Sequence, residues 1–390
     1  MNSADGRSGP LTSLKIVELA GIGPGPFCGM LLSDLGADVI RVDRASEAGG
    51  YGARGFLLGR GRRSIAVDLK APEGVELALK LAERADGLFE GYRPGVAERL
   101  GVGPETCMQR NPRLVYGRMT GWGQDGPWAQ MAGHDINYIG LSGALGAIGR
   151  AGQPPVPPLN LVGDFGGGGM LLALGMLAGL IEARQSGQGQ VVDAAMVDGS
   201  ALLMTMMYEL AGRGAWNPDR GSNLLDTGSP FYEVYETRDG KHVCFGSLEP
   251  QFFAQLVEHL GLDFDLARQN DRSAWPELRK QISESVGART RDEWEERMTG
   301  SDVCFAPVLG LSEAAEHPHN RARGTFTEFE GSPQPAPAPR FSRTPGRITR
   351  PSALSGEHSE EILRDWGFEA REIESWLESG ALRSAGPGED

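Results

Sequence analysis

The sequence predicts an α/β fold, in which a Rossmann-like large domain with a parallel sheet is followed by a smaller α+β domain. Three observations support this prediction. The chain has 390 residues, which is long enough for two domains. Short β-branched runs alternate with helical patterns over the first two hundred residues, which is typical of a parallel sheet with crossover helices. After about residue 225, alternating strands joined by a tight turn indicate a second domain.

The predicted parallel sheet opens with a βαβ unit. Residues 14–19, LKIVEL, are expected to form a buried strand, and a turn rich in glycine and proline leads from it into a helix. A second strand follows at residues 38–43, DVIRVD. The alternation continues with the strand SIAVDL, the amphipathic helix PEGVELALKLAERA and the short runs GLFEGY and RLVYGRM. Residues 164–212 are predicted to be mainly helical, except for the strand-like run QVVDAA.

The second domain is predicted to begin with a β-hairpin. The run FYEVYETRDGKHVCFGS alternates apolar and polar residues on both sides of Asp239 and Gly240, a pair typical of a hairpin turn. The proline-rich run GSPQPAPAPRFSRTPG predicts an extended linker, after which two helices return to the large domain. The predicted large domain covers residues 1–215 with its return at 340–390, the small domain covers 225–330, and the linkers cover 216–224 and 331–345.

The charge and the cysteines argue against several functional classes. The chain has 38 Lys and Arg against 52 Asp and Glu, which gives a formal charge of -14. This balance opposes general binding to nucleic acid or to anionic membranes. The four cysteines lack CxxC spacing, so we expect neither a disulfide framework nor a metal site. The longest apolar run, residues 170–181, is too short to span a bilayer, and no signal-peptide pattern opens the chain, so we expect a cytoplasmic protein.

The common nucleotide and hydrolase motifs do not occur in the sequence. The run GIGPGPFCG does not have the GxGxxG spacing, and no GxxxxGK[ST] motif is found. The run GLSGA differs from the nucleophile elbow GxSxG by one glycine. Nicotinamide, ATP and serine hydrolase chemistry are therefore disfavoured.

Basic residues gather where the predicted strands end. Open α/β sheets bind ligands at the carboxyl ends of their strands, and guanidinium groups suit phosphates. A solvated charged rim would explain the pattern equally well. The cluster consists of Arg44, Arg60, Arg62, Arg63, Lys70, Arg93 and Arg99.

A histidine and an aspartate, His134 and Asp135, stand side by side in the run MAGHDINYIG. Gly133 before them and the apolar run after them predict that they open a helix. Free backbone N–H groups and the positive end of the helix dipole would then favour an oxyanion. The alternative is that Asp135 only caps the helix.

Two further acidic residues precede predicted helices. Asp164, with Asn160 before it, stands ahead of an apolar helix, and the alternative for it is an N-cap role. The glycines 166–169 cost about 1 kcal/mol each against alanine inside a helix, so we expect something to approach their backbone closely, either a packed helix or a ligand. Glu249 begins the helix after the hairpin, where an acidic residue is common.

Several long runs of unusual residues carry a resemblance to a known family. They are ELAGIGPGP, EGYRPGV, MTGWGQDGP, AGHDINY, NLVGDFGGGG, GQVVDAAMVDG, SLEPQFF and CFAPVL. On these runs the sequence resembles the α-methylacyl-CoA racemases of the family III CoA-transferase (CaiB/BaiF-like) superfamily, from about residue 10 to residue 345. The resemblance implies that superfamily's fold, with an interlocked homodimer. The insertion SEAGGYGARGFLLGRG and the C-terminal tail depart from the family's pattern.

The resemblance implies an acyl-CoA thioester as substrate. His134 and Asp164 would exchange the α-proton of a 2-methylacyl-CoA, each on one face, with Glu249 bonded to the histidine. Asn160 and Tyr232 would lie nearby. The implied coenzyme contacts are Arg44, Val67, Asp68, Leu69, Lys70, Gly91, Tyr92, Arg93, Arg99, Gly133, Asp135, Ile136, Asn137 and Tyr138. Because coenzyme A is part of the substrate, no separate cofactor is implied.

The chemistry of inversion agrees with a His and Asp pair. Inverting a carbon beside a thioester requires a base on one face and an acid on the other, and fixed donors for the enolate oxygen. Two alternatives remain. In a CoA transferase of the same superfamily, Asp164 would attack the thioester as a nucleophile. A non-catalytic protein that binds coenzyme A would need the basic cluster but not the pair.

Overall fold

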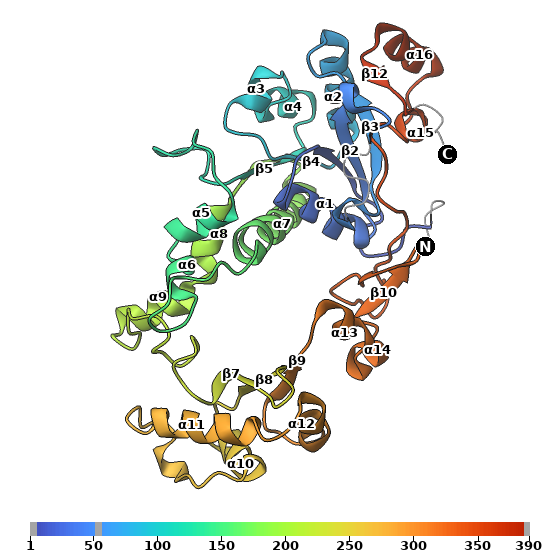
Figure 1. The fold of residues 1–390 in the computed structure, drawn as a ribbon. Helices are drawn as coiled ribbons and strands as arrows, with labels where there is room; N and C mark the ends of the chain where they lie inside the picture. Colours follow the sequence, from blue (N-terminus) through green and yellow to red (C-terminus); the bar gives the residue numbers. More distant parts are fainter. Residues whose placement is uncertain (1–5, 51–56, 386–390) are drawn as a thin grey trace. The chain divides into compact units, whose positions relative to one another are not determined.

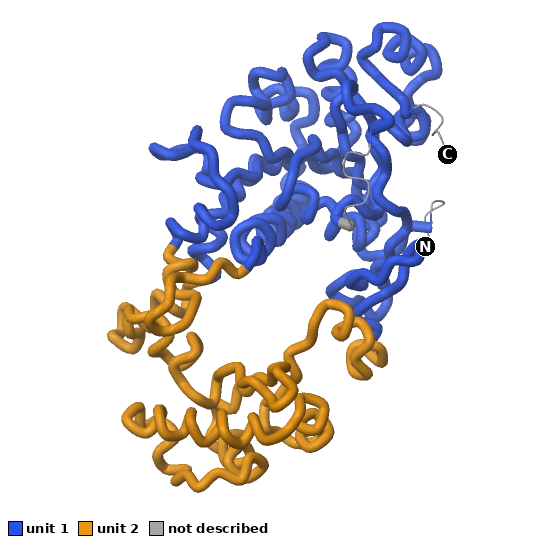
Figure 2. Tube along the Cα trace, viewed as in Figure 1, with its two compact units in different colours: residues 1–142, 159–203, 324–390 blue, residues 143–158, 204–323 orange. Residues whose placement is uncertain are grey.

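The computed structural model describes residues 6–50 and 57–385. It divides into two compact units (Figure 2). The larger unit comprises Met1–Ser142, Leu159–Leu203 and Gly324–Asp390, and the smaller unit comprises Gly143–Pro158 and Met204–Arg323. This division assigns residues 204–215 to the smaller unit, whereas the sequence suggested a boundary at residue 215. The centre of the insertion SEAGGYGARGFLLGRG, residues 51–56, lies outside the described residues.

A seven-stranded sheet forms the centre of the larger unit, in the order β12-β3-β2-β1-β4-β5-β6. Figure 1 labels β2, β3, β4, β5 and β12 of this sheet. Neighbouring strands are parallel, except that β12 runs antiparallel to β3 at the edge. The predicted parallel, Rossmann-like sheet is confirmed. The strands are β1 Lys15–Leu19, β2 Asp38–Arg44, β3 Arg63–Val67, β4 Gly87–Glu90, β5 Val115–Thr120, β6 Val191–Ala195 and β12 Leu382–Arg383.

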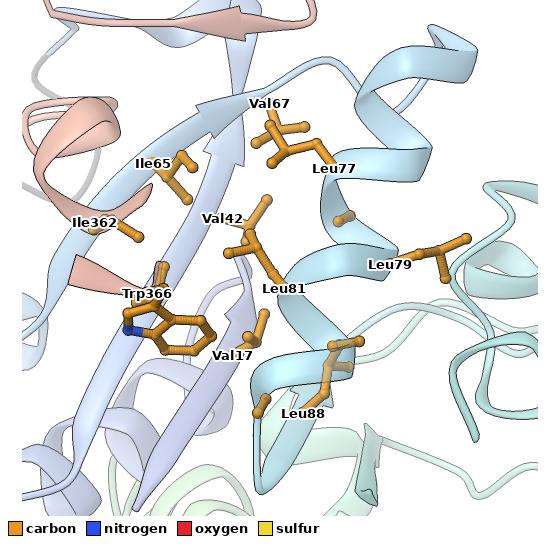
Figure 3. Close-up of a cluster of buried hydrophobic side chains, with 14 of the residues drawn as sticks. Val17, Val42, Ile65, Val67, Leu77, Leu79, Leu81, Leu88, Ile362 and Trp366 are labelled. Atoms are coloured by element: carbon orange, nitrogen blue, oxygen red, sulfur yellow. The ribbon is translucent and has the colours of Figure 1, made fainter. Parts of the chain in front are cut away.

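Helices cover the sheet, and two separate hydrophobic clusters fill the space between them and the strands. One cluster joins β1 to β4 with α2 and the C-terminal helices, and it includes Val42, Leu81 and Trp366 (Figure 3). The other includes Leu32 of α1 and Met176 of α7. The helices are α1 Pro24–Asp34, α2 Pro72–Arg84, α3 Val96–Arg99, α4 Pro104–Arg110, α5 Asp135–Leu141, α7 Leu171–Ser186, α8 Met196–Leu203, α15 Ser359–Asp365 and α16 Ala370–Ser379.

A π-helix, Leu161–Met170, precedes α7 and contains the four glycines. A Cβ added at Gly167 would lie 2.6 Å from the backbone nitrogen of Ser200 in α8, and one at Gly169 would lie 2.6 Å from the carbonyl oxygen of Pro24 in α1. Close packing of two helices therefore accounts for these two glycines, which is one of the two explanations expected from the sequence.

The π-helix and α7 together form a helix of 26 residues, Leu161–Ser186, with a mean hydropathy of 1.5 over its most apolar window. By length and composition alone it is sufficient to cross a membrane, and it is longer than the apolar run considered in the sequence. Its residues Leu172, Met176 and Leu180 lie in the core against the sheet. Packing against the sheet accounts for the apolar residues on this buried face of the helix.

We expect Gly167→Ala to destabilise the protein by about 3 kcal/mol, because the methyl group would overlap backbone atoms that cannot move independently. Thermal unfolding measures this loss. Gly212→Ala is the matched control, since nothing lies within 4 Å of a Cβ at this position in helix α9, Thr205–Gly212. An equal stability for both variants would contradict the packing explanation.

The smaller unit contains an antiparallel sheet of three strands in the order β7-β8-β9. Strands β7 Tyr232–Glu236 and β8 His242–Gly246 form the predicted hairpin, and β9 is Phe305–Val308. A core around Phe231, Phe253 and Trp294 joins the sheet to three helices, α10 Pro250–Leu260, α11 Trp275–Val286 and α12 Arg291–Met298. The unit also contains α6 Ala144–Ala147, α9, α13 Leu311–Glu316 and α14 Pro318–Arg323.

The predicted second linker is partly ordered into a sheet. Strand β10, Phe326–Phe329, pairs with β11, Ser332–Pro335, in an antiparallel ribbon. The first residues of the proline-rich run therefore form a strand. Proline is compatible with this strand because both strands of a two-stranded ribbon are edge strands.

Candidate active site

The strand order has a topological switch point between the neighbouring strands β1 and β4. Chain connections run in opposite directions on either side of these two neighbouring strands, and open α/β sheets bind ligands outside the carboxyl ends of strands at such a point. The turn Ala20–Gly23 follows β1, and Gly91–Arg93 follow β4. The candidate residues of the larger unit come from the loop after β4, from the ends of β2 and β3, from α3, and from the first turns of α5 and the π-helix.

Asp164 lies in the first turn of the π-helix, half-buried, with its side chain directed at the turn after β1. A Cβ added at Gly23 would lie 3.2 Å from Oδ2 of Asp164. The amide of Asn160 donates a hydrogen bond of 3.1 Å to the same oxygen. The N-cap alternative for Asp164 is wrong, because Asn160 occupies the N-cap position.

Asp135 connects the first turn of α5 to the first turn of the π-helix. Its side chain is 6% exposed, and Oδ2 accepts the backbone N–H of Asp164 at 2.7 Å. Its other oxygen, Oδ1, has no hydrogen-bond partner among the described residues. Asp135 is the first residue of α5 and His134 is the N-cap, so the alternative that Asp135 caps the helix is wrong.

The pKa of the Asp164 carboxyl is raised above its ordinary value, mainly because burial disfavours its charge. The hydrogen bond from Asn160 lowers this pKa, the neighbouring charge of Asp135 raises it, and His134 lowers it. His134 directly precedes Asp135, whose Oδ2 accepts the backbone N–H of Asp164 at 2.7 Å, so this hydrogen bond links the two candidate residues through the backbone. A carboxyl group with a raised pKa suits proton transfer near neutral pH.

His134 directly precedes α5, as the sequence predicts. Its backbone is extended, and its N–H donates to Oδ1 of Asn137 at 3.0 Å. The N–H groups of Asn137 and Tyr138 both donate to the carbonyl oxygen of His134. Among the described residues, the N–H groups of Asp135 and Ile136 have no acceptor, so they are available to a ligand.

Tyr138 supports the loop before the helix. Its ring meets that of Trp122 edge to face at 4.7 Å between centroids, and its hydroxyl donates to the carbonyl oxygen of Gly133. The pKa of Tyr138 is raised by burial and by Asp164, and lowered by Arg93. Trp122 was not predicted as a site residue, although the run MTGWGQDGP that contains it carried part of the resemblance.

The candidate coenzyme contacts lie around the carboxyl edge of the sheet. The pKa of the Tyr92 hydroxyl is raised by burial and by the charge of Glu90, and Arg44 lowers it. Arg44 is exposed, and its Nη1 lies 3.6 Å from Oε1 of Glu47.

The segment after β3 holds further candidate contacts. Val67 ends β3 and is buried, and the N–H of Lys70 donates a hydrogen bond to Oδ1 of Asp68, which closes the turn. Lys70, Arg93 and Arg99 are exposed and form no salt bridge within residues 6–50 and 57–385.

Three arginines of the predicted basic cluster are structural. Arg60, Arg62 and Arg63 are buried and pair with Asp34, Glu18 and Asp38 respectively. Both expectations for them are wrong, since they neither face a phosphate site nor form a solvated rim. Buried charges require partners, and the carboxylates of α1, β1 and β2 supply them. The spacing of the arginines in the sequence does not reveal these long-range pairs.

Glu249 and Tyr232 belong to the smaller unit. Glu249 is exposed and is the N-cap of α10. Tyr232 begins β7 beside a hollow of about 380 Å³, which Val234, Cys244 and Cys304 also line. The contact of Glu249 with the histidine stays a prediction. Within the described residues, no three His, Cys, Asp or Glu side chains gather as a metal site would require.

Comparisons with known proteins agree with the resemblance. The sequence model of CoA-transferase family III matches residues 11–359. The chain is 46% identical to alpha-methylacyl-CoA racemase of Mus musculus and 43% identical to that of Homo sapiens, in each case over 93% of this chain and 95% of the relative. It is 30% identical to a succinate–glutarate CoA-transferase of Agrobacterium fabrum over 94% of this chain and 98% of the relative. The crystal structure of a CAIB/BAIF family protein from Brucella suis superposes with a TM-score of 0.80 at 25% identity, covering 92% of this chain and 100% of that one.

Proposed function

Because this chain belongs to CoA-transferase family III, we propose that it is an α-methylacyl-CoA racemase, which interconverts (R)- and (S)-2-methylacyl-CoA thioesters. The observation that carries this proposal is the hydrogen bond that links the two candidate residues: Oδ2 of Asp135, which directly follows His134, accepts the backbone N–H of Asp164 at 2.7 Å. Relatives named as racemases are 43–46% identical to the chain, against 30% for the transferase from Agrobacterium fabrum, which favours the racemase.

In the proposed mechanism, one member of the pair removes the α-proton and the other returns a proton to the opposite face. An enolate forms between the two steps, and its charge gathers on the thioester oxygen. The N–H groups of Asp135 and Ile136 lie in the first turn of α5, at the positive end of its dipole, where they would stabilise this oxygen. Glu249 would fix the tautomer of the histidine. The reaction requires no cofactor beyond the coenzyme A of the substrate, and we propose that it takes place in the cytoplasm.

The test of the proposed function is α-proton exchange. A single enantiomer of a 2-methylacyl-CoA, incubated with the protein in D2O, should gain deuterium at the α-carbon and lose its optical purity without any acceptor acid. A CoA transferase with Asp164 as nucleophile would transfer the coenzyme only when an acceptor acid is added. A protein that only binds coenzyme A would give neither result.

We expect Arg93→Ala to weaken coenzyme A binding at least about tenfold, since a charge-assisted bond to phosphate is worth about 1.5–3 kcal/mol. Calorimetric titration measures the affinity, which should also fall with added salt. Arg113→Ala is the control, because this exposed arginine precedes β5 at the amino edge of the sheet. An unchanged affinity in Arg93→Ala would remove this residue from the coenzyme site.

We also propose that the protein is an interlocked homodimer. Met170, Leu174 and Ile181 lie on one face of the helix Leu161–Ser186, and each is more than half exposed. An apolar face of this kind favours burial against another chain. Light scattering should report twice the mass of 41.7 kDa. An active monomer at low concentration would contradict the dimer.

A further inference from the structure

Glu90 is a buried acid that the mechanism above does not use. It ends β4, it is 1% exposed, and it directly precedes the segment Gly91–Arg93. Its Oε2 accepts the backbone N–H of Tyr92 at 2.5 Å. This bond holds the segment at the carboxyl end of the strand, where the coenzyme contacts are proposed.

Arg118 lies beside Glu90 and is its register partner on the parallel strand β5. Nε of Arg118 is 3.4 Å from Oε1 of Glu90, and Nη1 is 2.9 Å from Oε1 of Glu98 in α3. Burial and then the charge of Glu90 raise the pKa values of Tyr92 and Tyr116, and Asp193 of β6 is the register partner of Arg118. Oε1 of Glu90 and Nε of Arg118 form no hydrogen bond with the described residues.

The charge of Glu90 changes near neutral pH. Burial raises the pKa of its carboxyl to about 7, although the Tyr92 N–H and Arg118 lower it; Glu98 raises it further. The hydrogen bond to Tyr92 is charge-assisted only while Glu90 is ionised, and such bonds are roughly twice as strong as neutral ones. The hydrogen bond that fixes the segment Gly91–Arg93 therefore becomes stronger as the pH rises through the pKa of Glu90.

We propose that Glu90 is a positioning residue, whose ionised carboxylate fixes Tyr92 and thereby orients Arg93 toward the phosphates of coenzyme A. This inference rests on the proposed function, because it takes coenzyme A as the ligand. Arg118 lies between the carboxylates of Glu90 and Glu98 and offsets part of their negative charge. Coenzyme affinity should accordingly be higher at pH 8 than at pH 6.

The experiment titrates dephospho-coenzyme A into the full-length protein at several pH values from 6 to 8.5. This ligand lacks the 3′-phosphate, whose second ionisation near pH 6 would obscure the result. We expect the wild-type affinity to rise about fivefold over this range, the difference between a neutral and a charge-assisted bond. Glu90→Gln should bind about fivefold more weakly at pH 8, with an affinity that no longer depends on pH in this range.

The inflection of the curve of coenzyme affinity against pH should lie at the pKa of Glu90. Substitutions of two residues next to Glu90 should shift this inflection in opposite directions. Glu98→Gln removes a charge that raises the pKa of Glu90, so the inflection should move to lower pH while the affinity at pH 8 is kept. Arg118→Gln removes a charge that lowers this pKa, so the inflection should move to higher pH. A residue with only a structural role would not produce opposite shifts.

A Glu90→Gln variant that keeps the wild-type pH profile would overturn the inference and leave the proposed function intact. If that variant fails to fold, an inflection that is unmoved in both Glu98→Gln and Arg118→Gln overturns it equally. A wild-type protein that binds no dephospho-coenzyme A and no coenzyme A at any pH would instead overturn the proposed function, and the inference with it.

Discussion

Replacing either His134 or Asp164 by alanine should lower the rate of inversion of a 2-methylacyl-CoA about a thousandfold. A proton lost from one face can no longer be replaced on the other, and general acid–base catalysis is worth about 10²–10⁴-fold per group. The N–H groups of Asp135 and Ile136 are part of the backbone, so the stabilisation of the enolate should largely survive both substitutions.

Chiral chromatography of the substrate measures the inversion rate. His319→Ala and Asp263→Ala are controls, since both side chains are exposed in the smaller unit and should leave the rate unchanged. Inversion at the wild-type rate by His134→Ala or by Asp164→Ala would disprove the role of that residue.

Glu18→Gln should destabilise the protein by about 3–5 kcal/mol, because it leaves the buried guanidinium of Arg62 without a counter-charge. The side chains of Glu18 and Arg62 are 0% and 1% exposed, so water cannot replace the lost partner. The free energy of unfolding in denaturant measures the loss. Coenzyme affinity of the folded variant should stay unchanged, because Arg62 is structural.

Glu83→Gln is the matched control for this substitution. Glu83 pairs with Arg110 at 2.8 Å, but both side chains are partly exposed, and such a pair is worth about 0–1 kcal/mol. A loss in Glu18→Gln as small as in Glu83→Gln would show that Arg62 does not depend on its buried partner.

The parallel sheet could be predicted because its strands are short β-branched runs between clear helical patterns. Strand β12 could not, since two residues, Leu382 and Arg383, are too few to form a pattern and are held there by pairing with Val67 and Ala66. The close packing around the π-helix could not be predicted either, because the atoms that approach Gly167 and Gly169 come from α8 and α1, which are distant parts of the chain.

The start of α5 at His134 could be predicted from the glycine before it and the apolar run after it. The roles of the arginines could not, because only the folded topology brings Arg62 to Glu18. Glu90 was missed for a similar reason. An acidic residue directly after the apolar residues of the run GLFEGY indicates a carboxylate at the end of a buried strand. Its partner Arg118, however, lies 28 positions further along the sequence.

The central claim is that His134 and Asp164 act on opposite faces of the α-carbon, and enantiomer-resolved deuterium exchange tests it most directly. Each pure enantiomer of a 2-methylacyl-CoA is incubated in D2O with His134→Ala or with Asp164→Ala, and the α-proton is followed by NMR. A variant that keeps one base can still remove the proton and return deuterium to the same face. We therefore predict that each variant exchanges one enantiomer without inverting it, and that the two variants prefer opposite enantiomers. Full racemisation by either variant would contradict the assignment of two bases.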